Sequence, residues 1–278
     1  MTNLIRADFR RLFKNRAFYI CTVLLFIAGA ALALIHYLTM RDYPPALSFD
    51  TYFTEYALLA VIALAAFSAL FIGADYSDGT IRNKLVAGSR RSSVYLSNLA
   101  VQTVTGLILC IAYLVPYIII GTTLISDFPD NGVRLILVSL AMTVSFASIF
   151  TLIAMLSSSK ARSAVICLVC AIALMAAGLI VSNALAEPEF YSTYSLDADG
   201  AIVETHDTPN PGYISGTQRT VLMAVNDLNP GAQAMRIFTK DGFGSLPEVG
   251  KMDALYDLAI IVLTTGAGIL IFKKKDLK

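Results

Sequence analysis

Few side chains in this sequence have the types and spacings that carry out covalent chemistry. Its two histidines, His36 and His206, belong to no HExxH or other metal-ligand pattern, and no GxxxxGK[ST] phosphate-binding loop occurs. Cys167 and Cys170 have CxxC spacing, but they lie in an apolar run, which favours small packing residues over a redox or metal site. The sequence therefore predicts no catalytic residue, no metal and no cofactor in this chain, and no enzyme activity of its own.

Polar side chains inside otherwise apolar stretches are the remaining candidates for functional residues. Asn98, Gln102 and Thr105 fall in one such stretch, and Asp257 lies near the start of the last one. Two interpretations are open for the first three, namely hydrogen bonds between membrane helices or the lining of a central cavity. For Asp257 the alternatives are a solvated helix end and a position on a substrate path.

The composition indicates that these stretches are membrane spans. Apolar residues make up 56% of the 278 residues and charged residues only 15%, whereas soluble domains carry roughly 25% charged residues. About 20 apolar residues cross a bilayer as a helix. By that measure the sequence predicts an all-α membrane protein, residues 1–278 forming one transmembrane domain, with six spans: Ala17–Leu38, Tyr56–Ala74, Val94–Ile125, Val133–Leu156, Ser163–Leu185 and Leu255–Phe272.

Charge predicts the orientation of these spans. The segments on the side of the two termini carry 15 of the 21 basic residues and 4 of the 20 acidic ones, a net charge of +11, against −10 on the other side. Basic residues concentrate on the cytoplasmic side of membrane proteins. We therefore expect a multi-pass protein of the plasma membrane with both termini in the cytoplasm.

Three segments outside the spans have distinct patterns. Residues 1–16 alternate apolar and basic residues at helical spacing, which predicts an amphipathic elbow helix at the membrane surface rather than a cleaved signal peptide. Residues 186–254 form a large exterior loop, with a possible hairpin around Asp197–Gly200 and a helical stripe, Val221, Leu222, Val225 and Leu228, that ends at Asn229-Pro230-Gly231. This loop is either exposed with local helices or a helical cap over the spans.

The third segment, residues 75–93, predicts a short helix on the cytoplasmic side. Ser77 and Asp78 can cap its start, and Gly88 suits a left-handed stop. Ile81 and Leu85 share one face by i,i+4 spacing, while basic residues point elsewhere. Because the flanking charges oppose burial in lipid, we expect that apolar face to need a socket in a soluble partner.

The same segment resembles a motif of the type-2 ABC exporter permeases. The run Tyr76-Ser77-Asp78-Gly79-Thr80-Ile81-Arg82-Asn83-Lys84-Leu85 is similar to the family pattern E-Y-x-x-G-T-I-R-N, with Asp75 where Glu is commoner. The order of elbow helix, two spans, coupling helix, four spans and an exterior excursion before the last span is also similar.

The resemblance implies a dimer of permease subunits, identical or homologous, in which each subunit rests on a separate ATPase that binds ATP and Mg. It implies ATPase contacts on the coupling helix, at Ile81, Arg82, Lys84, Leu85 and Arg90. The expected cargo is amphipathic or hydrophobic, such as an antimicrobial peptide, a drug or a lipid, because the spans offer few charged groups. The alternative is a membrane sensor or scaffold whose exterior loop binds a ligand. Partners are therefore an ATPase, a second permease and the bilayer, with no nucleic acid.

Overall fold

The computed structural model describes residues 2–42, 49–157, 159–196, 202–238 and 252–275. Within them, six helices are long and apolar enough to cross a membrane: α2 (Arg16–Met40), α4 (Tyr56–Ser77), α6 (Arg91–Leu124), α7 (Gly132–Leu156), α8 (Lys160–Ala186) and α11 (Asp253–Lys274). The prediction of a mostly helical multi-pass membrane protein with six spans is confirmed. Most helices begin or end a few residues outside the predicted spans, because hydropathy marks the part suited to lipid whereas the internally bonded backbone continues beyond it.

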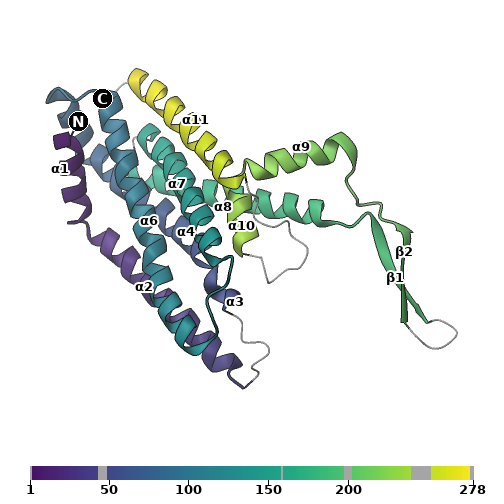
Figure 1. The fold of residues 1–278 in the computed structure, drawn as a ribbon. Helices are drawn as coiled ribbons and strands as arrows, with labels where there is room; N and C mark the ends of the chain where they lie inside the picture. The colour runs from purple at the N-terminus through teal and green to yellow at the C-terminus, as the bar shows by residue number, and fades with distance from the viewer. Residues whose placement is uncertain (1, 43–48, 158, 197–201, 239–251, 276–278) are drawn as a thin grey trace.

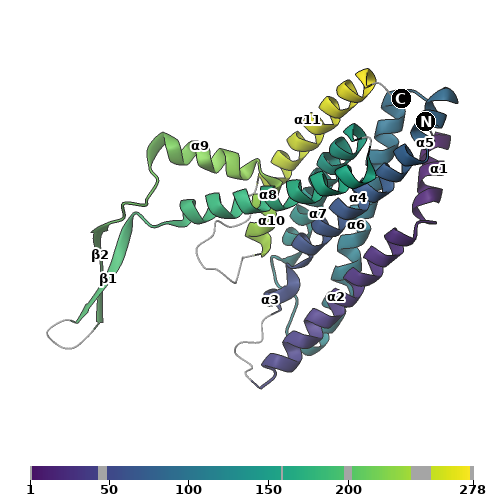
Figure 2. The same cartoon turned by 180° about the vertical axis from the view of Figure 1, so that it is seen from behind.

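Helix α4 is the centre of the bundle. It packs against α2, α6, α7 and α8, and side chains such as Leu64, Ala65 and Phe67 are fully buried. Helices α2, α8 and α11 lie outside it (Figure 1 and Figure 2) and expose large apolar side chains such as Val169 and Leu263. Exposed apolar surface of this kind suits helices that face lipid on one side.

The two termini lie at the same end of the bundle, together with two short helices (Figure 1 and Figure 2). These are α1 (Thr2–Leu12), a helix within residues 1–16 where one was predicted, and α5 (Thr80–Val86), a helix within residues 75–93 where one was predicted. We call this the terminal end and the opposite one the distal end.

The distal end carries a β-hairpin that projects from the bundle (Figure 1). Strands β1 (Phe190–Leu196) and β2 (Ile202–Pro209) pair antiparallel, with Leu196 opposite Ile202. A hairpin is thus present where one was expected, although its turn at 197–201 lies outside the described residues. The short helix α3 (Asp50–Phe53) closes the same end, where Phe49, Phe53 and Tyr117 pack ring against ring.

Two further helices precede the last span. Helix α9 (Gly216–Asp227) contains most of the predicted stripe, and α10 (Pro230–Phe238) begins at the proline that was expected to end it. Asn229 donates to the carbonyl oxygen of Leu174 at 2.8 Å, and Gly231 lies against the same residue, in the middle of α8. No side chain fits at Gly231, so glycine permits the contact. Helix α10 therefore folds back into the bundle, and its packing favours the cap over the exposed loop.

Candidate partner-docking site and buried ion network

Two glycines with left-handed backbone delimit α5. These are Gly79, with φ 67°, and Gly88, with φ 88°. Gly88 ends the helix as predicted. The helix begins at Thr80 as predicted, but the predicted cap was wrong: α4 continues through Ser77, whose hydroxyl donates to the carbonyl oxygen of Gly73 at 3.0 Å, and Gly79 is the N-cap residue. The chain reverses direction in two residues between α4 and α5, which fixes α5 against the terminal end of the bundle.

The apolar face of α5 packs on the chain's own helices. Ile81 is 1% exposed and shares a cluster with Leu12 of α1 and Phe71 of α4, and Leu85 packs partly buried against this cluster. The expectation that Ile81 and Leu85 need a socket in a partner is therefore corrected. Because α1 folds across the terminal end, the chain supplies that socket itself.

The outward side of α5 is open. Val86 is 82% exposed, and Arg82 and Arg90 are exposed beside it in the chain. We call Arg82, Val86 and Arg90 the docking surface. An exposed apolar side chain flanked by arginines has a composition that is compatible with contact with another protein. Val86 was not among the predicted contact residues. Its five-residue offset from Ile81 places it on a different helix face from Ile81, which the sequence already indicated.

A cavity of about 490 Å³ adjoins the docking surface. It is lined by Leu4 of α1 and by residues of the turn after α5, including Gly88, Arg90 and Ser93. The cavity extends the surface from α5 to α1. A partner that grips the turn at Arg90 would therefore contact the elbow helix as well.

Lys84 of α5 points into the protein, where it forms an ion network. Its ammonium nitrogen lies 2.6 Å from Asp8 Oδ1 and 3.2 Å from Asp75 Oδ2, and Arg11 pairs with Asp75. The Ser97 hydroxyl donates to the second oxygen of Asp8. The network joins α1, α4, α5 and α6. Lys84 is thus an internal link, and its expected role as an ATPase contact is corrected because its charge is already paired.

The two carboxylates of the network are nearly free of solvent. Asp8 and Asp75 side chains are each 2% exposed. Burial lowers the pKa of Lys84 below its ordinary value, an effect that the hydrogen bond and charge of Asp8 oppose, and burial lowers the pKa of Arg11 to about 10. Two cations face two carboxylates, so the attraction between them offsets the cost of removing four charges from water.

Sequence reasoning missed the partners of Lys84, yet a signal was present. Asp8 and Asp75 are two of only four acidic residues in the segments that carry the positive charge. A carboxylate in a basic helix such as residues 2–12 is expected to pair with a cation one turn away or on a neighbouring helix. Spacing alone did not show which cation, because Lys84 follows Asp8 by 76 residues.

A second set of contacts fixes the end of α11 at the terminal end. The amine of Lys275 donates to the Tyr76 hydroxyl and to the carbonyl oxygen of Met155, both at 3.0 Å. Arg91 donates to the carbonyl oxygen of Phe272 at 3.1 Å. Burial, and secondarily the charge of Arg162, lowers the pKa of Lys275 to about 8. These bonds tie α11 to α4, α6 and α7.

The polar residues of α6 are packed between helices. Asn98, Gln102 and Thr105 are each 0% exposed. Gln102 accepts a hydrogen bond from Ser68 of α4 at 2.9 Å, and Asn98 and Thr105 each donate to the carbonyl oxygen four residues earlier. None of the three faces open space in this structure, and hydrogen bonding between helices, one of the two interpretations, is present at Gln102, whereas Asn98 and Thr105 bond within α6.

Asp257 is also inside the protein. It is 0% exposed, and its Oδ1 accepts a hydrogen bond from Ser145 of α7 at 2.8 Å. The solvated helix end is wrong, because α7 covers this side of α11, and a position on a substrate path stays a prediction. Nearby, Arg236 of α10 pairs with Asp253 at 3.1 Å and with Asp227 at 2.9 Å, which links α9, α10 and α11.

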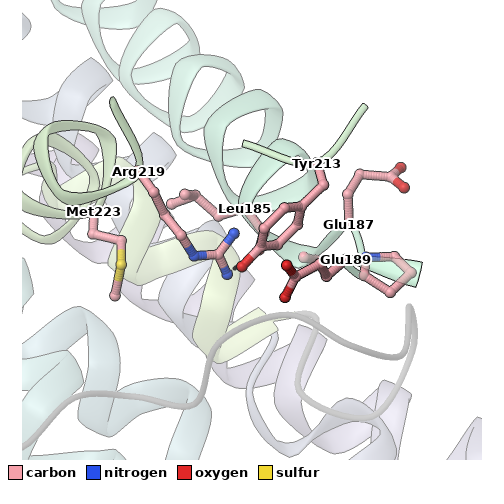
Figure 3. Close-up of a pocket in the computed structure, with 8 residues that line it drawn as sticks. Leu185, Glu187, Glu189, Tyr213, Arg219 and Met223 are labelled. Atoms are coloured by element: carbon pink, nitrogen blue, oxygen red, sulfur yellow. Dashed lines mark hydrogen bonds between the residues drawn. The ribbon is translucent and has the colours of Figure 1, made fainter. Parts of the chain in front are cut away.

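The distal end has a cavity of its own, of about 460 Å³, between the end of α8 and the start of α9 (Figure 3). Its lining includes Leu185, Glu187, Glu189, Tyr213 and Arg219. The Arg219 guanidinium donates to the carbonyl oxygen of Leu185 at 2.9 Å and lies over the Tyr213 ring, 5.0 Å from its centroid. The exterior region therefore has a defined concave surface as well as a hairpin.

Comparison with protein-family models finds no match to this chain. Comparison with curated proteins finds no similar one.

Proposed function

We propose that this chain is the membrane-spanning permease subunit of an ABC exporter, driven by ATP hydrolysis on a separate subunit. The docking surface is the observation that carries the proposal. It presents one strongly exposed apolar side chain, Val86, between Arg82 and Arg90. Burial of this side chain by a protein partner would remove its apolar surface from water.

The anchoring of α5 supports a role in force transmission. Lys84 holds α5 to Asp8 of α1 and Asp75 of α4, and Ser97 brings in the start of α6. A partner that pulls on Val86 would move these four helix ends together. In the proposed cycle, ATP binding closes two ATPase subunits, the docking surfaces follow, and the spans reorient.

The charge distribution supports a cytoplasmic position for the docking surface. The segments at the terminal end carry the net +11 charge, and basic residues mark the cytoplasmic side. We place the chain in the plasma membrane with both termini inside. A second permease subunit, identical or homologous, would complete the transport path, since Asn98 and Gln102 are buried and offer no path through this chain.

The cargo class follows from the lipid-facing surface. Large apolar side chains are exposed along α2, α8 and α11, as at Leu24, Val169 and Leu263. A path bordered by such surface suits an amphipathic or hydrophobic substrate. A peptide, a drug and a lipid all have this chemistry.

A membrane sensor or scaffold is the second candidate. The distal cavity and the projecting hairpin favour it, because both present surface away from the spans. The two functions differ at the terminal end. A permease requires a nucleotide-hydrolysing partner on the docking surface, whereas a sensor does not.

Co-purification with ATP turnover tests the proposal. An affinity-tagged chain purified from its native membrane should retain a protein that contains a GxxxxGK[ST] loop, and the preparation should hydrolyse ATP. Val86→Asp should remove that protein, because it places a charge in the contact. Met252→Asp, also exposed but at the distal end, is the matched control. An unchanged complex with Val86→Asp, or no nucleotide-binding protein at all, would refute the proposal.

A further inference from the structure

The distal cavity contains two opposite charges that do not neutralise one another. Arg219 bonds only to backbone carbonyl oxygens, of Leu185 at 2.9 Å and of Ile214 at 3.3 Å. Among the residues that the structure describes, neither Arg219 nor Glu189 forms an ion pair. Glu187 differs from Glu189, because its carboxylate accepts a hydrogen bond from Asn210 at 3.0 Å. The cavity thus offers one unpaired cation and one unpaired anion.

Figure 3 shows how these groups lie. Arg219 reaches from α9 toward Tyr213, and the carboxylate of Glu189 is turned to the same part of the cavity, whereas that of Glu187 is turned away. The volume of about 460 Å³ lies within the roughly 300–1,000 Å³ of small-molecule sites. Leu185 and Met223 add apolar surface beside the charged groups.

The cavity lies where a membrane surface is expected. It is at the end of α8, one of the six long apolar helices. From there α9 runs back along α8, since Asn226 donates to the Ser182 hydroxyl at 2.9 Å. The side of α9 away from α8 exposes Val221, Val225 and Leu228. An apolar stripe at i, i+4 and i+7 beside a spanning helix suits contact with acyl chains.

From these observations we propose that the distal cavity binds the headgroup of a zwitterionic phospholipid from the distal leaflet. The lipid phosphate pairs with the Arg219 guanidinium, which presents donors suited to phosphate oxygens. The lipid ammonium pairs with Glu189. The glycerol region contacts Leu185 and Met223, and the acyl chains continue into the bilayer. An anionic lipid without an ammonium group can pair with Arg219, but its negative charge is repelled by the Glu189 carboxylate.

The site requires no ATPase partner, so it stands or falls independently of the proposed function. Its chemistry is also distinct from that of a basic peptide. A basic peptide would use Glu189 and would be repelled by Arg219, whereas the zwitterionic lipid uses both.

Lipid retention tests the site. The purified full chain is equilibrated in detergent with equal amounts of phosphatidylethanolamine and phosphatidylglycerol, and the lipids retained after gel filtration are measured by mass spectrometry. The chain should retain phosphatidylethanolamine in preference. Glu189→Gln should reduce the preference about tenfold, as expected for the loss of a bond to a charged group. Glu187→Gln, whose carboxylate is already bonded, should leave it unchanged.

Arg219 needs two variants, because it also holds α9 to the end of α8. Arg219→Lys keeps the positive charge and should keep the preference for phosphatidylethanolamine, whereas Arg219→Gln should retain neither lipid. An equal preference in Glu189→Gln and in the parent chain would overturn the proposal. So would loss of binding in Glu189→Gln with full retention in Arg219→Gln, which would indicate a site for cations alone.

Discussion

Lys84 matches the motif by its residue type, but its side chain does not have the role that the motif suggested. Basic residues on a short cytoplasmic helix suggest contacts with a partner, yet the Lys84 side chain is only 12% exposed and bridges Asp8 and Asp75. The long, flexible stem of lysine allows its charge to turn inward from an otherwise exposed helix. Arg82, two residues earlier, stays outside. Spacing in the sequence shows on which face of the helix a charged residue lies. It does not show which group that residue pairs with.

Removing the charge of Lys84 should destabilise the protein. Lys84→Met leaves buried carboxylates with too few cations, which typically costs about 3–5 kcal/mol. We expect a lower thermal unfolding midpoint in detergent, and partial recovery when Asp8→Asn is added. Lys273→Met, at an exposed lysine, should have little effect. An unchanged midpoint for Lys84→Met would show that the ion network contributes no stability.

Lys275 should give the protein a distinct pH dependence. Burial holds its pKa in the folded protein at about 8, below the ordinary 10.5. At pH values between these two pKa values, Lys275 binds more protons in the unfolded chain than in the folded one. Its contribution to the free energy of unfolding therefore rises with pH. The neutral amine still donates to Tyr76 and Met155. The unfolding midpoint of the parent chain should therefore rise relative to that of Lys275→Met between pH 7.5 and 9.5; a constant difference contradicts this.

At the scale of elements, the sequence predicted the helices far better than their contacts. Six apolar stretches, a basic N-terminal helix and the stop at Gly88 are all present, because length, hydropathy and glycine act locally. The N-cap residue of α5 and the packing of α10 against the middle of α8 were not predicted. The second depends on how segments distant in sequence meet, as Gly231 meets Leu174.

The same limit applies to the candidate site. Arg82 and Arg90 were predicted on the surface and lie there, whereas Ile81 faces inward into a cluster with side chains of α1, α4 and α6. The orientation of α1 across α5 depends on Asp8 and Arg11, which no local pattern connects to Lys84. Burial of a short helix is a tertiary property, and periodicity gives only the face that will be buried.

The packing of α10 on α8 predicts a specific sensitivity to side-chain volume. Gly231→Val would force a side chain into the backbone of α8, so α10 should leave the bundle. Ala234, which is 0% exposed, would then become accessible. We expect Ala234→Cys to react with a membrane-impermeant maleimide only when Gly231→Val is also present, with variants lacking Ala234→Cys as background. Gly266→Val, where nothing lies within 4 Å, is the control and should not increase labelling.

At the scale of the whole molecule, a formal charge of +1 conceals two strongly charged ends. The net +11 at the terminal end and −10 at the other side fit a chain that crosses the membrane six times and returns. Because translocation of basic segments is unfavourable, this polarity should set the orientation.

Site-directed labelling in intact cells checks the orientation. Thr208→Cys, at an exposed position of the distal hairpin, should react with an impermeant maleimide, and Asn83→Cys, exposed on α5, should react only after the cells are opened. The opposite pattern would place the docking surface outside the cell and remove the basis for an ATP-driven partner.

The ion network also bears on how the chain is made. Asp8 and Arg11 leave the ribosome early, but Lys84 and Ser97 follow 76 and 89 residues after Asp8. Until then Asp8 lacks the two partners from α5 and α6 that it has in the folded chain, and the charges of the N-terminal helix remain in water at the membrane surface. The first two spans therefore have to insert before the elbow helix can dock. A nascent chain that stalls before residue 84 would display an undocked, charged helix, which is a feature that membrane proteases and chaperones can recognise.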